Sequence, residues 1–257
     1  MPEHEAKNAV QTSRMTFRVI EALEQLKNAN LTEVAEYLGE PKSTVHNHLN
    51  TLVESCYLTK NSGTYKLGLR FTELGEKCKQ RYPVYKVGEE EVEKLAAETE
   101  ELANLAVEEH GRVVYLHRAE GQSSISTDTF AGKRVALHST ALGKAMLAFM
   151  EEERVEKIID NSELAAETEH TITERGDLWE ELESIKQNEV AYDDEERAYG
   201  IRCVAAPILA QNSKELLGAV SISAPKHRMK EERFTETFPE ILQNAANVIQ
   251  IELTYAD

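Results

Sequence analysis

The sequence has few cysteines and no long apolar run. Its three cysteines, Cys56, Cys78 and Cys203, are odd in number and widely spaced, which argues against a disulfide framework and against a Cys-Xaa-Xaa-Cys metal site. No apolar run reaches the roughly 18 residues of a membrane span, so no membrane partner is expected. The first residues are polar and contain acids, unlike a secretion signal. These absences predict a cytoplasmic protein with reduced thiols.

The common catalytic motifs are also missing. The chain has no Gly-Xaa-Ser-Xaa-Gly elbow, no phosphate-binding glycine loop and no paired His/Cys spacing. A nucleophilic triad or a zinc site built from Cys203, His138 and Asp193 therefore has no support in the local sequence. We expect no catalytic residue, no metal site and no cofactor.

Basic residues are the minority. There are 29 Lys and Arg against 46 Asp and Glu, a net charge of −17. Residues 1–80 contain ten basic and ten acidic residues, so the whole excess lies in residues 81–257. Because charges are screened beyond about 8–10 Å, an acidic excess confined to residues 81–257 does not prevent residues 1–80 from approaching a polyanion. The acidic surface has two explanations, ordinary glutamate-rich helix faces or adaptation to a salty cytoplasm in a halophile, and both stay open.

The segment from Leu31 to Leu67 has the pattern of a winged helix-turn-helix. Thr32 is placed to cap a short helix that ends at Gly39. After Pro41, a second helix opens near Ser43, and its apolar face consists of Val45, Leu49, Leu52 and Val53. Two strands that carry lysine flank the turn Asn61-Ser62-Gly63 and form the wing. The alternative is a three-helix packing module that binds no nucleic acid.

The second helix of this segment presents a polar face without a carboxylate before Glu54, as contact with DNA phosphates requires. The expected partner is therefore a double-stranded DNA operator. We predict phosphate contacts from Lys42, Ser43, Thr44, Lys60 and Lys66. We predict base contacts from His46, Asn47 and Asn50, and further DNA contacts from Thr32 and Tyr65.

The chain around this segment divides into four parts. We predict a flexible arm over 1–12, a DNA-binding domain over 13–68 whose first helix is capped by Ser13, a linker helix over 69–83 that Pro83 stops, and a second domain over 84–257. The second domain is predicted to contain a helix over 87–102, a hairpin over 103–117, a weak strand over 124–129, a helix from Thr140, strands over 190–192, 201–209 and 216–223, and a final helix over 231–254. This mixture predicts the α+β class, with an antiparallel or mixed sheet.

Several residues of the second domain suggest a ligand pocket. Ser221 and Ser223 share one face of a strand, where a polar ligand, or else neighbouring backbone or water, must satisfy their hydroxyls. The helix that begins at Thr140 offers N–H groups to a carboxylate. In the acidic run 193–196 we expect Asp193 alone to point inward and the rest to be solvated. Cys203 is interpreted first as a buried structural thiol, then as a ligand contact, and His138 as a structural hydrogen-bonding residue.

The chain resembles the IclR-type transcription regulators from about Ser13 to Leu253. The resemblance rests on PKSTVHNHLNTL and TYKLG in the first domain and on the blocks 137–145, 171–173, 192–196, 200–207 and 219–223 in the second. It implies a GAF-like effector domain that binds a small metabolite, often an organic acid, and a homodimer or homotetramer. Carried over residue by residue, it implies a pocket lined by Ala141, Leu142, Asp193, Cys203, Ser221 and Ser223.

One departure from the family concerns base recognition. Asn47 stands where the recognition helix usually carries an arginine. Asparagine pairs with adenine, whereas arginine prefers guanine, so the base preference of relatives is not carried over. The sequence thus predicts a ligand-responsive regulator of a catabolic pathway, either a repressor or an activator. The alternative is a ligand-independent DNA-binding factor whose second domain only oligomerises.

Overall fold

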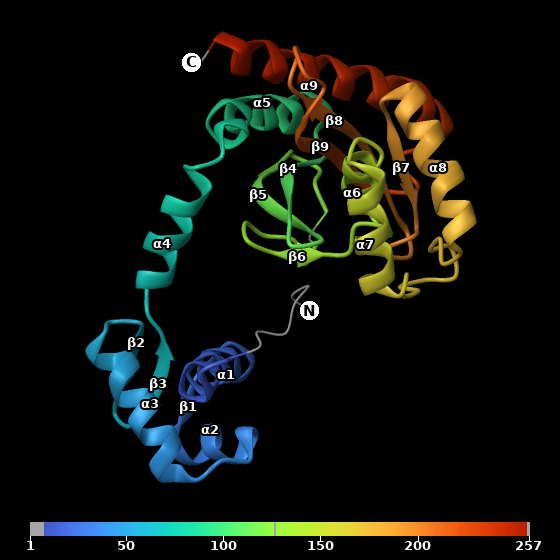
Figure 1. Ribbon diagram of the computed structural model, residues 1–257. Helices are drawn as coiled ribbons and strands as arrows, with labels where there is room; N and C mark the ends of the chain where they lie inside the picture. Colours follow the sequence, from blue (N-terminus) through green and yellow to red (C-terminus); the bar gives the residue numbers. More distant parts are fainter. Residues whose placement is uncertain (1–7, 126, 256–257) are drawn as a thin grey trace. The chain divides into compact units, whose positions relative to one another are not determined.

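The computed structural model describes residues 8–125 and 127–255 (Figure 1). The chain forms two compact units, one ending at Lys79 and the other beginning at Gln80, and each is described here by itself. Most of the predicted flexible arm, residues 1–7, lies outside the described residues. None of the helices in the described part of the chain has the length and apolar content needed to cross a membrane.

The first unit is a helical head with a small wing. Its elements are α1 (Gln11–Leu26), β1 (Ala29–Asn30), α2 (Leu31–Leu38), α3 (Lys42–Glu54), β2 (Leu58–Asn61), β3 (Thr64–Leu67) and α4 (Arg70–Lys79). The strands pair in the order β1-β3-β2. Ser62 and Gly63 both have positive φ, as a two-residue hairpin turn between β2 and β3 requires. Apolar side chains of α1, α2 and α3, among them Val19, Val34 and Leu49, form one core beneath the wing.

Two predicted helix starts in this unit are wrong. Asn30, not Thr32, caps α2: its side chain accepts hydrogen bonds from the N–H groups of Thr32 and Glu33, and the Glu33 carboxylate accepts one from the N–H of Asn30. This reciprocal pair is a capping box, and it places Thr32 inside the first turn. Helix α1 begins at Gln11, before Ser13, and has no side-chain cap. The predicted end of α2 is confirmed, because Gly39 adopts the left-handed conformation there.

Pro83 begins a helix and does not stop one. The helix expected over 69–83 corresponds to α4 and ends at Lys79. Helix α5 (Pro83–Thr99) then starts with Pro83 as its first residue. Proline suits this position, because N–H groups in the first turn of a helix have no acceptor within the helix. The absence of an N–H group in proline therefore loses no helical hydrogen bond.

The second unit contains a six-stranded antiparallel sheet between two layers of helices (Figure 1). Its strands are β4 (Leu102–Glu109), β5 (Arg112–Glu120), β6 (Arg134–Val135), β7 (Ala191–Asp194), β8 (Ile201–Leu209) and β9 (Leu216–Pro225), in the order β6-β5-β4-β9-β8-β7. Helices α5 and α9 (Phe238–Tyr255), the latter preceded by a π-helix over Arg233–Thr237, cover one face. Helices α6 (Ala141–Leu147), α7 (Glu152–Ser162) and α8 (Arg175–Asn188) cover the other. The predicted α+β class is confirmed, but the described residues of 124–129 form no strand.

Strand β9 divides its side chains between these two layers. Val220 and Ile222 are buried in the core formed with α5 and α9. Because successive side chains of a strand alternate, Ser221 and Ser223 lie on the opposite face, toward α6. The predicted sharing of one face by the two serines is thus confirmed.

Candidate functional site

The first unit exposes the polar face of α3 beside the wing. Lys42, Ser43, His46, Asn47 and Asn50 are exposed and Thr44 is half-buried, whereas Val45, Leu49 and Leu52 are buried beneath them. No acidic residue occurs between Pro41 and Val53. Asn50 Nδ2 lies 3.3 Å from His46 Nε2, so these two neighbours on α3 form one polar group. This face has the composition that a DNA groove accepts.

The wing adds two exposed lysines, Lys60 and Lys66, one on each of its paired strands. Tyr65, which pairs with Lys60 across the wing, has only 1% of its surface exposed and packs in the core of the head. Lys60 Nζ lies 5.0 Å above the centre of its ring. The predicted DNA contact from Tyr65 is therefore wrong: its ring supports the wing from inside, because the alternation of β3 turns it away from the surface on which Lys66 lies. Thr32 remains partly exposed at the start of α2.

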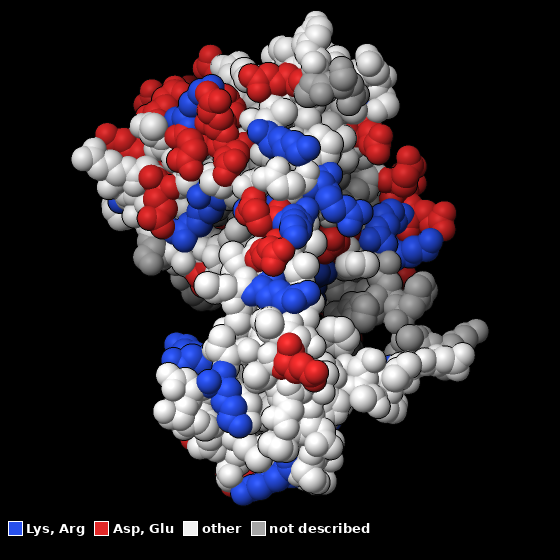
Figure 2. All heavy atoms as spheres, turned by 90° about the vertical axis from the view of Figure 1, so that its left-hand side faces the viewer, with Lys and Arg blue, Asp and Glu red and all other residues white. Residues whose placement is uncertain are grey.

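Charge is distributed unevenly between the two units. In Figure 2, acidic side chains gather over the second unit, in the upper part of the view, whereas the visible face of the first unit carries basic groups and few acidic ones. On the first unit, Arg18 of α1 forms an ion pair with Glu40, at 2.7 Å, and donates to the Leu38 carbonyl. These contacts fix the turn before α3 while leaving the acid-free helix face open.

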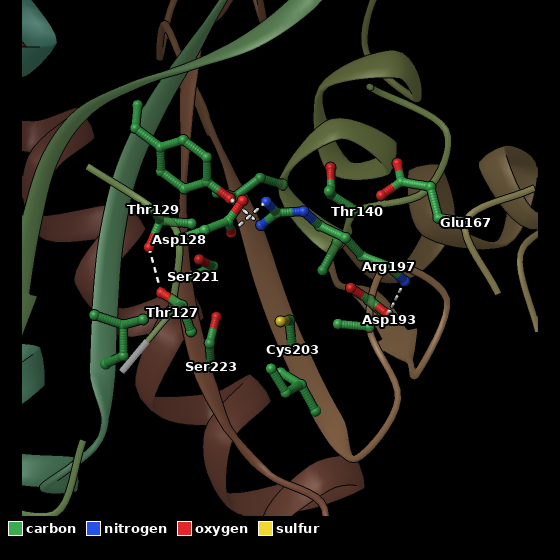
Figure 3. Close-up of a pocket in the computed structure, with 16 residues that line it drawn as sticks. Thr127, Asp128, Thr129, Thr140, Glu167, Asp193, Arg197, Cys203, Ser221 and Ser223 are labelled. Atoms are coloured by element: carbon green, nitrogen blue, oxygen red, sulfur yellow. Dashed lines mark hydrogen bonds and ion pairs between the residues drawn. The ribbon is translucent and has the colours of Figure 1, made fainter. Parts of the chain in front are cut away.

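The second unit contains a cavity of ≈ 410 Å³ on the α6 side of its sheet (Figure 3). All six residues predicted to line a pocket, which are far apart in the sequence, meet around it: Ala141, Leu142, Asp193, Cys203, Ser221 and Ser223. Cys203 and the two serines come from adjacent strands of the sheet. Further polar lining comes from residues that the sequence patterns did not single out: Tyr115, Thr127, Asp128, Thr129, Glu167 and Arg197.

Asp193 is the most deeply buried acid of the cavity. Its Oδ1 accepts hydrogen bonds from the N–H of Glu196, at 2.7 Å, and of Arg197, at 3.4 Å. Burial, and after it the charge of Glu196, raises the pKa of Asp193 to about 7. Near neutral pH this carboxyl group therefore exists in both forms, as an acceptor or as a donor to a ligand.

The remainder of the acidic run 193–196 is not a solvated loop, contrary to our prediction. Glu196 is buried and forms an ion pair with Lys144 of α6, which is only 1% exposed and also contacts Glu181 at 3.1 Å. Asp194 pairs with Arg202 at 2.8 Å, and Glu195 pairs with Lys226. These ion pairs thus connect residues 194–196 to Lys144 of α6, to Arg202 of β8 and to Lys226 after β9.

Burial shifts the pKa values of Cys203 and His138. Burial, and then the charge of Asp193, raises the pKa of the Cys203 thiol, so it stays protonated at neutral pH. His138 Nε2 is hydrogen-bonded to the carbonyl of Ala165 at 3.1 Å, and burial lowers the pKa of its ring. This confirms His138 as a structural hydrogen-bonding residue. Over residues 8–125 and 127–255, no group of three or more His, Cys, Asp or Glu side chains is placed to hold a metal ion.

The start of α6 offers fewer free donors than the sequence suggested. The Thr140 hydroxyl accepts a hydrogen bond from the N–H of Gly143 at 3.0 Å, and the Thr140 carbonyl accepts one from the N–H of Lys144. Ser221 in turn accepts a hydrogen bond from Asn104 Nδ2 at 3.3 Å. Its hydroxyl thus has a protein partner already and retains its own proton for a ligand.

Comparisons with known proteins agree with this two-unit organisation. The model of the bacterial transcriptional regulator IclR C-terminal domain matches residues 77–251, and that of the IclR helix-turn-helix domain matches residues 16–62. A probable HTH-type transcriptional regulator, ArcR, from Halobacterium salinarum is 32% identical, with 98% of this chain and 99% of that protein covered. Its source organism fits adaptation to a salty cytoplasm, one of the two explanations given above for the acidic composition.

More distant relatives extend the same picture. The HTH-type transcriptional regulator KdgR from Escherichia coli is 29% identical over 97% of this chain and 95% of its own length. The crystal structure of the Thermotoga maritima IclR covers 95% of this chain and 98% of its own, with a TM-score of 0.80 at 27% identity. An IclR homologue from Microbacterium hydrocarbonoxydans, complexed with 4-hydroxybenzoate, shares the fold, with a TM-score of 0.81 at 22% identity over 95% of this chain and 99% of its own.

Proposed function

Because the chain belongs to the IclR family of transcriptional regulators, we propose that a small organic acid bound in the cavity controls how its winged helix-turn-helix binds a DNA operator. The observation that carries this proposal is the convergence of six residues, predicted from the sequence, around one cavity of ≈ 410 Å³, the size of a small-molecule site. The regulated genes are those of a catabolic pathway.

The DNA-binding surface in this proposal is the exposed face of α3 together with the wing. His46, Asn47 and Asn50 contact base edges, and the lysines and hydroxyls contact phosphates: Lys42, Ser43, Thr44, Lys60 and Lys66, with Thr32 at the start of α2. Exposure of these side chains and the absence of acid on the helix face support this assignment.

The effector in this proposal is an anion that also offers a hydroxyl or keto group. Arg197 supplies the positive charge, while the hydroxyls of Ser221 and Ser223 and the carboxyl of Asp193 supply directional hydrogen bonds. The Microbacterium hydrocarbonoxydans homologue binds 4-hydroxybenzoate, which has both a carboxylate and a hydroxyl group. The likeness supports the ligand class and not the particular compound.

We further propose a homodimer or homotetramer that works in the cytoplasm. In this proposal the DNA-binding domain is residues 13–68 and the effector-binding and oligomerisation domain is residues 84–257. Residues 69–83 form the linker between these two domains. Two heads held at a fixed distance match two half-sites one DNA turn apart. We propose no catalysis, which is supported by the protonated thiol of Cys203 and by the hydrogen bond that holds His138 to Ala165.

Binding of the full-length protein to genomic fragments, with and without a panel of small organic acids, tests the proposal. We expect at least one acid to raise the unfolding temperature and to change operator affinity. Asp193→Ala and the double variant Ser221→Ala/Ser223→Ala should keep operator binding and lose this response. The exposed Asp177→Ala, on α8, is the matched control and should respond like the wild type. If no acid stabilises the protein, the ligand-independent DNA-binding factor is the better interpretation.

A further inference from the structure

Arg197 is the only Lys, Arg or His among the described residues that line the cavity. Its guanidinium does not project freely into the space. Nη2 donates to Asp128 Oδ1 at 2.9 Å, and Nη1 lies 3.4 Å from the Tyr115 hydroxyl. In Figure 3 the side chain of Arg197 runs from beside Asp193 toward Asp128, so its guanidinium borders the same space as the other residues that line the cavity.

Asp128 comes from a different part of the chain, the connection between β5 and β6. Its side chain is 66% exposed, whereas that of Arg197 is 19% exposed. Lys133 Nζ also approaches Asp128, at 3.2 Å. Partial burial opposes ionisation, but the charges of Arg197 and Lys133 outweigh it and lower the pKa of Asp128. Asp128 is therefore a carboxylate paired with Arg197, the one arginine among the described residues that line the cavity.

The ion pair between Arg197 and Asp128 can be replaced by one between Arg197 and a ligand at little cost in free energy. A pair with one solvent-exposed partner contributes little to stability, so its separation costs little. Asp128 uses only one of the two parallel N–H groups that a guanidinium offers to a carboxylate, whereas a free ligand is able to take both. Arg197 itself is largely buried and still needs a negative partner after Asp128 leaves.

We propose that Asp128 holds the position of the effector's carboxylate in the ligand-free protein, and that binding exchanges one carboxylate for the other on Arg197. The inference rests on the proposed effector function of this cavity and deepens it. Arg197 selects ligands with a carboxylate over their uncharged analogues. Asp128 competes for the same donors and so sets the ligand concentration that is needed to occupy the cavity. Lys133 offers the displaced Asp128 a partner that is already in contact.

Calorimetric titration of the full-length protein tests the exchange. The probes are acetate and 4-hydroxybenzoate, each compared with its uncharged amide, acetamide and 4-hydroxybenzamide. Asp128→Asn should bind at least one of the two carboxylates about tenfold more tightly than the wild type, with no change for the amides. Arg197→Gln should lose the preference for carboxylate over amide, and Arg197→Lys should recover part of it because it keeps the charge without the forked donor.

The chain provides a matched control. Arg175 and Asp160 form an ion pair outside the cavity, in which the aspartate is also 66% exposed. Asp160→Asn and Arg175→Gln therefore remove the same charges and should leave the affinities for all four probes unchanged. If Asp128→Asn binds neither carboxylate more tightly than the wild type, or if Arg197→Gln keeps the preference, the exchange is overturned.

The same variants separate this inference from the proposed function. A carboxylate that binds with the expected dependence on Asp128 and Arg197, while no acid tested affects operator binding, supports the exchange and contradicts the sensor function. An acid that affects operator binding equally in the wild type and in Arg197→Gln supports the sensor function and contradicts the exchange.

Discussion

At the scale of single residues, the protonation of Asp193 couples the cavity to pH. Burial, with the charge of Glu196, raises its pKa from an ordinary value near 3.8 to about 7 in the folded protein. A carboxyl group whose pKa is higher when folded stabilises the native state below the unfolded pKa, and that contribution is lost as the pH rises through the folded pKa. Asp193 thus favours the folded state at pH 4 and disfavours it above pH ~7.

We therefore predict that Asp193→Asn removes part of the pH dependence of stability. Between pH ~5 and ~8 the free energy of unfolding of the wild type should fall relative to that of the variant, by an amount on the order of a few kcal/mol. Urea unfolding at several pH values measures this difference. Parallel pH profiles for the two proteins would contradict the raised pKa of Asp193.

Asn47 and Lys66 should have different effects on DNA binding. Asn47 on α3 is placed to contact a base edge, so Asn47→Ala should cost about 1–3 kcal/mol on the cognate operator and little on scrambled DNA. Lys66 on the wing is placed to contact a phosphate, so Lys66→Ala should weaken binding to both sequences alike and reduce the salt dependence. Titrations at several salt concentrations distinguish the two. Equal losses on both sequences for Asn47→Ala would exclude base recognition by this residue.

The residues found from sequence and those missed differ in a physical way. Ser221 and Ser223 lie on a regular strand, where the period of two fixes the direction of each side chain, whereas the family resemblance alone implies a cavity position for Cys203. Arg197 and Asp128 lie on irregular connections and meet across 69 positions of the chain. Glu196 looked like part of a charged surface loop because its partner, Lys144, is on a helix far away in sequence. No periodic pattern carries such long-range charge pairing.

At the scale of elements, the position of α6 depends on the absence of a side chain at Gly143. A Cβ atom on Gly143 would lie 2.1 Å from the Leu137 carbonyl oxygen and 2.4 Å from the Leu137 Cα, both of them backbone atoms. The helix therefore packs directly on the chain that enters it, and this contact sets where Thr140, Ala141 and Leu142 line the cavity. A side chain at this position must displace the helix.

We predict that Gly143→Ala destabilises the second unit by at least the ~1–3 kcal/mol typical of an overpacked core and weakens effector binding. Gly176→Ala is the matched control: Gly176 is also in a helix of this unit, α8, but no atom lies within 4 Å of its added Cβ. It should be neutral or slightly stabilising, because alanine is the better helix former. Thermal unfolding compares the two, and equal midpoints would contradict the close packing of α6.

Helices and strands were predictable where local chemistry decides them. Gly39 at the end of α2 and the turn Ser62-Gly63 have positive φ, which glycine favours, so the glycines predict both features from the sequence. The prediction for Pro83 is wrong because proline is compatible both with the end of a helix and with the first position of one, and only the structure shows that Pro83 opens α5. Thr32 is a good capping residue by type, which is why the sequence predicts a cap there; the reciprocal bonds between Asn30 and Glu33 identify Asn30 as the cap instead.

At the scale of the whole molecule, regulation requires that the cavity and the DNA-binding surface affect each other. Lys144 and Glu196 connect α6 with the loop after β7, so a ligand on Asp193 and Arg197 contacts a loop that is bonded into the helix layer. Coupling between the cavity and the DNA-binding surface is a free energy that links two binding events. The measure is the factor by which one ligand changes the affinity of the other.

We predict that this factor is equal in both directions. If a saturating organic acid lowers or raises operator affinity by about 5–150-fold, then saturating operator must change the affinity for the acid by the same factor, because both are legs of one thermodynamic cycle. Operator titrations with and without the acid, and acid titrations with and without operator, give the two values. Asp128→Asn should tighten acid binding in both series and leave their ratio unchanged, since Asp128 competes for Arg197 whether or not DNA is bound. A factor of one in both directions would leave the second unit with no influence on the first, as in the ligand-independent alternative.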